Sequence, residues 1–78
     1  MDLEFIGIDP ETGSGNCPAV WVDRDRAEFV LQGWKADDET LTRTRRDSPL
    51  PDREAVVRLP YRMADTLRKA LDEAAAGA

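Results

Sequence analysis

The chain has 78 residues, a net charge of −5 from 16 acidic and 11 basic side chains, one cysteine and no histidine. This length predicts a single domain over 1–78. Without histidine there is no histidine general base, no Ser–His or Cys–His couple and no histidine-containing zinc site, and the lone Cys17 excludes an intrachain disulfide. No motif singles out a carboxylate, a lysine or Tyr61, so we expect no enzyme, no cofactor and no metal. The acidic balance also disfavours nucleic acid as a partner.

Residues 3–8 are aromatic and β-branched and predict the first strand. Strict alternation would place Leu3 and Phe5 on one face of this strand, with Ile6 and Ile8 on the other.

Residues 9–18 contain prolines and glycines and predict a loop. The stretch Gly13-Ser14-Gly15-Asn16 lacks the Lys-Ser/Thr pair and the following helix of a phosphate loop, so it predicts a plain connection. Cys17 has no basic neighbour to activate it, and we interpret it as a partly buried structural thiol.

Two apolar runs, 19–23 and 27–35, flank a charged turn and predict a β-hairpin. Alternation in any directly paired register divides their side chains into two sets. One face takes Val20, Val22, Phe29 and Leu31, and the opposite face takes Trp21, Val30 and Trp34. Because both faces are apolar, we expect both to be covered.

Residues 38–46 predict a short helix, with Asp37 and its acidic neighbours at the N-terminal end. The arginines that follow form the one basic patch, Arg43, Arg45 and Arg46. A solvated helix end is the simplest interpretation of this patch. A contact with phosphate or with an acidic partner is the alternative.

Residues 47–53 contain two prolines and predict an extended loop, and 54–59 predict the last strand. A helix over 61–75 then begins after Pro60. Its predicted core stripe is Met63, Leu67 and Leu71. The side chains expected to point away from the core are Arg62, Asp65, Arg68, Lys69 and Asp72. The alanine-rich tail, 75–78, is expected to fray.

The element order β-β-β-α-β-α predicts an α+β fold, a small antiparallel sheet of about four strands with a C-terminal amphipathic helix. So small a domain usually needs a disulfide, a metal or a partner surface to be stable, which predicts a homodimer. Trp21, Val30 and Trp34 are the predicted protein interface, because tryptophan is enriched in interface hot spots. Burial of both tryptophans in the core is the alternative.

Five segments carry a family resemblance: EFIGIDP (4–10), AVWVD (19–23), QGWK (32–35), SPLPD (48–52) and VVRLP (56–60). With these segments the chain resembles small acidic actinobacterial proteins encoded beside helix-turn-helix regulators of the Xre type, similar in size and outline to the BldB-like and WhiJ-associated proteins. The resemblance implies a non-enzymatic accessory that binds, and antagonises, its cognate regulator.

Two alternatives remain open at this point: a nucleic-acid binder that uses Arg43, Arg45 and Arg46, and a structural domain. The unpaired cysteine is usual for the cytosol, and there is neither a signal-peptide pattern nor a long apolar run. We therefore expect a cytoplasmic protein without a membrane segment.

Overall fold

A computed structural model describes residues 1–77 of the chain. The first sheet has three antiparallel strands in the order β1-β2-β3. These strands are β1 Leu3–Ile8, β2 Ala19–Asp23 and β3 Glu28–Gln32. A second, two-stranded sheet joins β4 Trp34–Lys35 to β5 Val57–Arg58. The predicted α+β class with antiparallel strands is confirmed.

Three helical segments complete the fold. A 3-10 turn, η1 (Thr12–Ser14), lies in the first loop, and α1 covers Asp38–Thr44. The C-terminal helix begins with a 3-10 turn, η2 (Tyr61–Met63), and continues as α2 (Ala64–Ala76). Pro60 stands at its N-cap in extended conformation, as the sequence predicts. Of the predicted frayed tail, residues 75 and 76 are helical, and Ala78 lies outside the described residues.

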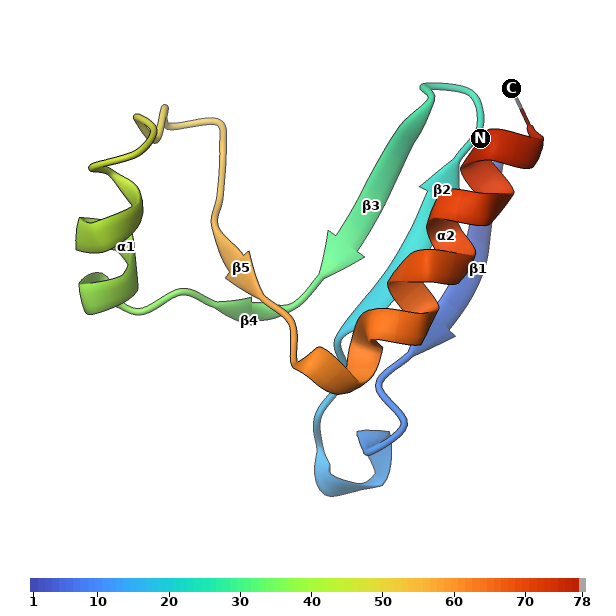
Figure 1. Ribbon diagram of the computed structural model, residues 1–78, viewed down its shortest axis with the longest axis horizontal. Coiled ribbons are helices and arrows are strands. Elements are labelled where there is room, and N and C mark those ends of the chain that lie inside the picture. The colour runs from blue at the N-terminus through green and yellow to red at the C-terminus, as the bar shows by residue number, and fades with distance from the viewer. Residues whose placement is uncertain (78) are drawn as a thin grey trace.

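The helix α2 crosses one face of the first sheet, over β1 and β2, and leaves β3 uncovered (Figure 1). The core lies between this helix and the sheet. Its buried members are Ile6, Val20, Val22, Met63 and Ala70, with Leu67 packed against them. The opposite face of the sheet carries no covering layer in Figure 1. The prediction that both faces are covered is therefore wrong for the single chain.

A β-bulge decides which residue of β1 reaches the core. Phe5 pairs with Trp21 and Gly7 pairs with Val20, so Ile6 is the extra residue between two regular pairs. Ile6 is buried in the core, whereas Ile8 pairs with Ala19 and is 40% exposed. The predicted sharing of one face by Ile6 and Ile8 is wrong, because the bulge shifts the alternation by one residue.

The helix presents small side chains to the sheet. A Cβ atom added at Gly7 would lie 2.9 Å from Cγ2 of Thr66, so α2 approaches β1 closely at this point. Ala70 is buried, whereas Leu71 is 57% exposed. The predicted stripe is therefore wrong at Leu71. Successive residues of an α-helix are about 100° apart around its axis, so the face that buries Ala70 turns Leu71 toward solvent.

The register of the hairpin agrees with the predicted faces: Val20 pairs with Leu31, Trp21 with Val30 and Val22 with Phe29. Of the four side chains predicted for the core face, only Val20 and Val22 of β2 are buried. Phe29 and Leu31 are 47% and 44% exposed, because α2 stops short of β3. Their predicted place in the core is wrong.

The predicted strand 27–35 is divided at Gly33. A Cβ atom at this residue would lie 2.6 Å from the carbonyl oxygen of Arg58, so the close approach of β4 to β5 requires glycine. From Trp34 the chain leaves the first sheet, forms α1 and returns through β5 (Figure 1). Residues 34–58 are called the arm below, and the first sheet with α2 is called the body.

Two arm elements are shorter than predicted. The helix ends at Thr44, where 38–46 was expected, and the strand expected over 54–59 contains only Val57–Arg58. The radius of gyration is 13.9 Å. A compact chain of this length has a radius of about 11.5 Å. The arm therefore gives the molecule an extended shape.

Candidate protein-interaction site

An open apolar groove lies where the uncovered face of the body meets the arm. Its volume is about 520 Å³, and its lining includes Trp21 and Val30 from the body and Val57 from the arm. Leu3 and Ala55 extend the apolar lining, and Lys35 is its one charged residue. The Trp21 ring packs against Phe5, with ring centroids 5.9 Å apart and planes tilted by 57°. The two aromatic rings form one continuous apolar surface, and Phe5 is 56% exposed.

The structure separates Trp34 from the other two predicted interface residues. Trp34 lies in β4, in the second sheet, and its ring faces the guanidinium of Arg62 at 5.9 Å. Lys35, the next residue, lines the groove beside Trp21 and Val30. The prediction that Trp34 shares their face is wrong, because the break at Gly33 ends the alternation on which it depends.

An ion pair between a buried carboxylate and a partly exposed arginine joins the end of β1 to the start of the C-terminal helix. Asp9 is 0% exposed, and both of its carboxylate oxygens accept hydrogen bonds from Arg62, at 2.6 Å from Nε and 2.6 Å from Nη2. The backbone N–H of Glu11 donates a third bond to Asp9, at 2.9 Å. Arg62 lies outside the core cluster, as predicted, but its guanidinium pairs with a buried carboxylate that the prediction did not include.

The same arginine also contacts Glu11, at 3.2 Å, and Trp34. It therefore links the first loop, β4 and the C-terminal helix. The hydrogen bonds from the Arg62 side chain hold the pKa of Asp9 below its ordinary value, against the opposing effect of burial. No sequence signal pointed to this pair, because 53 residues separate its members.

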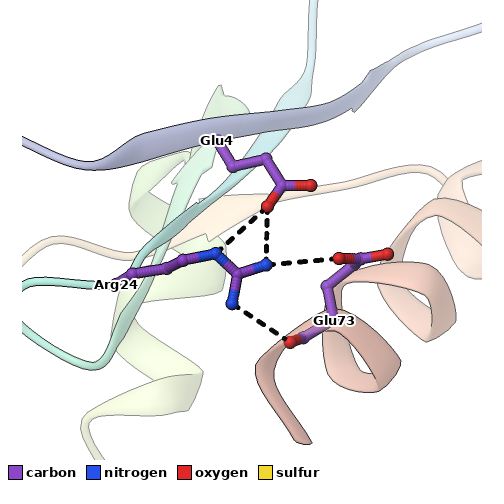
Figure 2. A network of polar contacts seen from close by, with 3 residues as sticks. All are labelled: Glu4, Arg24 and Glu73. Atoms are coloured by element: carbon purple, nitrogen blue, oxygen red, sulfur yellow. Dashed lines mark hydrogen bonds and ion pairs between the residues drawn. The ribbon is translucent and has the colours of Figure 1, made fainter. Parts of the chain in front are cut away.

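A second network holds the turn after β2 against the helix. Arg24 donates to Glu4 of β1, from Nη2 at 2.6 Å and from Nε at 3.2 Å, and to the Glu73 carboxylate of α2 at 3.2 Å. Figure 2 shows the guanidinium between the two carboxylates. These contacts raise the pKa of Arg24, and the hydrogen bonds with Glu4 make the largest contribution. The network is a structural clamp, since all of its charges are paired with one another.

The predicted basic patch lies on the arm, at the end of α1. Arg43, Arg45 and Arg46 are all exposed. Arg43 forms an ion pair with Asp47 at 2.6 Å. At the other end of α1 the Asp37 carboxylate accepts a bond from the backbone N–H of Thr40 at 2.8 Å, which confirms the predicted N-cap. The bonds with Thr40 also lower the pKa of Asp37.

The remaining chemistry-bearing residues form no reactive cluster. Within residues 1–77, no group of three or more histidine, cysteine or acidic side chains is placed to hold a metal ion. Cys17 is exposed, and its Sγ lies 3.5 Å from Oγ1 of Thr12. Its predicted partial burial is wrong, because the loop carries it to the surface. Among the helices of this part of the chain, none has the length and apolar character needed to cross a bilayer.

Comparison with known proteins finds no matching family model, no similar curated protein and no similar solved structure.

Proposed function

We propose that this chain is a non-enzymatic protein-interaction module, and that it binds its partner through the groove between body and arm. One observation carries the proposal: Trp21, Val30 and Val57 form an apolar lining that α2 leaves uncovered. Aromatic and aliphatic side chains grouped in a concave site are typical of the central anchors of protein interfaces.

The proposed partner is a helix-turn-helix transcriptional regulator encoded beside this chain. The sequence resemblance supports this choice, and so does the net charge of −5. The DNA-binding surface of a regulator is basic, so an acidic module is steered toward it and competes with DNA for it. Such a module acts as an antagonist in the cytoplasm, where the regulator meets its operator.

The test is isothermal titration calorimetry of the full chain against the purified regulator, with Val57→Asp as the groove variant. Val57 belongs to the arm and lies outside the buried core, so the substitution leaves the body intact. A charge in the centre of the interface is expected to weaken binding by about 30-fold or more.

Leu71→Asp is the matched control, because Leu71 is exposed on α2 and does not line the groove. It is expected to keep wild-type affinity. Circular dichroism checks that both variants stay folded. A folded Val57→Asp protein that keeps full affinity would contradict the proposed site, and the absence of any binding heat from the wild type would contradict the proposed partner.

The nucleic-acid alternative is tested by replacing Arg43, Arg45 and Arg46 with alanine. These arginines lie away from the groove lining, so their loss is expected to change only the association rate and its salt dependence. A gel shift of duplex DNA by the wild type that disappears in the triple variant would instead support direct nucleic-acid binding.

A further inference from the structure

The strand β3 is an edge strand without protection. All five of its residues are exposed, and its centre is Phe29-Val30-Leu31. It pairs with β2 on one side only, in a regular register without a bulge. Natural edge strands usually carry a central lysine, a proline, a bulge or a covering segment that prevents pairing with another chain. The centre of β3 has no such charge, proline or bulge. In Figure 1 the arm returns through β5 on this side of β3, across the groove that Val30 and Leu31 share with Val57.

The accessible surface of the chain is larger than its mass requires. The accessible surface is 5991 Å². A compact monomer of 8.7 kDa exposes about 4,700 Å², so this chain exposes roughly 1,300 Å² more than its mass requires. A stable interface of standard size covers about 800 Å² on each partner. The excess is larger than this area, and the extended arm and the uncovered face of the sheet both contribute to it.

We propose that two copies of this chain associate through their β3 strands, which pair antiparallel around a two-fold axis at Val30. The two three-stranded sheets then form one continuous sheet of six strands. This inference deepens the expected homodimer by naming its interface. Val30 and Leu31 also line the groove, so the second copy and the regulator share part of one surface. Formation of the dimer does not itself require the regulator.

The sequence of β3 is complementary to itself in this register. Phe29 lies opposite the partner's Leu31, which buries two side chains that α2 leaves exposed. Val30 lies opposite the partner's Val30 on the other face. Glu28 lies opposite the partner's Gln32, an uncharged residue with amide N–H donors. A parallel register would place Glu28 against the partner's Glu28, and directly opposed like charges destabilise a sheet.

Sedimentation equilibrium on the full chain tests the assembly. We expect twice the monomer mass of 8.7 kDa at micromolar concentration. Leu31→Lys places a charge at the centre of the edge, as natural edge strands do, and is expected to raise the dimer dissociation constant by about tenfold or more. Leu71→Lys is the matched control, because Leu71 is exposed on the helix outside β3, and it is expected to leave the constant unchanged.

Disulfide trapping tests the register. In a Cys17→Ser background, Val30→Cys places one thiol from each copy at the two-fold axis. Residues directly opposite in an antiparallel pair have Cα atoms about 4.5–5.5 Å apart, within the range that a disulfide spans. Mild oxidation is therefore expected to give a covalent dimer. Phe29→Cys and Leu71→Cys, in the same background, are expected to stay largely uncrosslinked, since neither residue faces its own copy.

Each outcome bears on the proposal. A wild-type mass of 8.7 kDa at every accessible concentration would overturn it. A dimer that Leu31→Lys does not weaken, or that crosslinks through Phe29→Cys and not through Val30→Cys, would overturn the β3 interface and its register. Val57 lines the groove but lies outside β3. Loss of regulator binding in Val57→Asp with an unchanged dimer dissociation constant would support the β3 interface and would assign the loss to the arm side of the groove.

Discussion

The body and the arm contain similar kinds of residues and differ in what covers them. In the body, α2 lies on β1 and β2 and buries a cluster around Val20 and Met63. In the arm, residues 34–58, no side chain is buried, although Trp34, Leu41 and Val57 are apolar. Burial of apolar surface is the main stabilising contribution in folding. The comparison indicates that buried apolar side chains stabilise the body, whereas the arm depends on local bonds.

Local bonds define the arm in the single chain. The β4–β5 ribbon has two paired positions, Trp34 with Arg58 and Lys35 with Val57. Arg58 also donates to the Thr40 hydroxyl at 2.6 Å, which ties α1 to the ribbon. An isolated two-stranded ribbon is only marginally stable in water, and a helix as short as α1 is marginal as well. The arm therefore opens more easily than the body.

Amide hydrogen exchange of the wild type measures this difference directly, and it is the largest effect expected. Amides of β2 are expected to exchange only by global unfolding, which for a domain of this size costs about 4–12 kcal/mol. Amides of α1 and of the β4–β5 ribbon are expected to exchange by local opening at a small fraction of that cost. Equal protection in α1 and β2 would show that arm and body unfold as one unit.

Met63→Ala tests the core of the body. Met63 is fully buried between α2 and the sheet, so its truncation is expected to destabilise the protein by about 2–5 kcal/mol. Leu71→Ala is the control on the same helix and is expected to cost about 0.5 kcal/mol or less, because Leu71 is exposed. Urea unfolding followed by circular dichroism measures both. A larger loss in Leu71→Ala would mean that the helix packs through a different face.

Asp9→Asn tests the ion pair that links the first loop to the C-terminal helix. The pKa of Asp9 is lowered by its bonds from Arg62, so the ionised carboxylate stabilises the fold above the unfolded pKa of about 4. This stabilisation is lost as the pH falls through the lowered folded pKa. At neutral pH the variant is expected to unfold at a lower urea concentration than the wild type, and the difference is expected to narrow in acid.

Asp65→Asn is the matched control for Asp9→Asn. Asp65 also pairs with an arginine, Arg68, but both side chains are exposed. Its loss is expected to change the urea midpoint little at any pH, because exposed pairs contribute little. If Asp9→Asn and Asp65→Asn shift the urea midpoint by the same amount, the pair of Asp9 and Arg62 stabilises the fold no more than an exposed pair does.

The sequence predicted the structural features that depend on residues close together in the chain. Predictions failed for features that depend on contacts between distant segments. Alternation gave the hairpin faces, because Trp21 and Val30 pair directly. The Asp37 cap of α1 and the start of the last helix after Pro60 are local signals, and both are confirmed. These features need no knowledge of the rest of the fold.

The failures follow from packing between elements. The bulge that turns Ile6 into the core depends on the pairing of β1 with β2, and the break at Gly33 depends on the backbone of Arg58. The residue pattern of one strand carries no information about the strand that faces it. Ala70 lies in the core and Leu71 does not, because the rotation of α2 on the sheet decides which of its faces is buried. For the candidate site, Trp21 and Val30 were predicted and line the groove, whereas the contribution of Val57 depends on how the arm returns.

Asp37→Ala tests the arm alone and is expected to have the smallest effect. Asp37 caps α1 by accepting the bond from the Thr40 N–H, and loss of an N-cap weakens the first turn of a helix. Amides of α1 are therefore expected to exchange several-fold faster, while the urea midpoint of the body stays unchanged. Asp37→Asn is the matched control, since asparagine caps nearly as well and is expected to keep wild-type exchange. Because no residue of α1 is buried, loss of the cap is not expected to change the packing of the core. A fall in the global midpoint as large as that of Met63→Ala would show that the arm supports the body, and the distinction between the two regions would then fail.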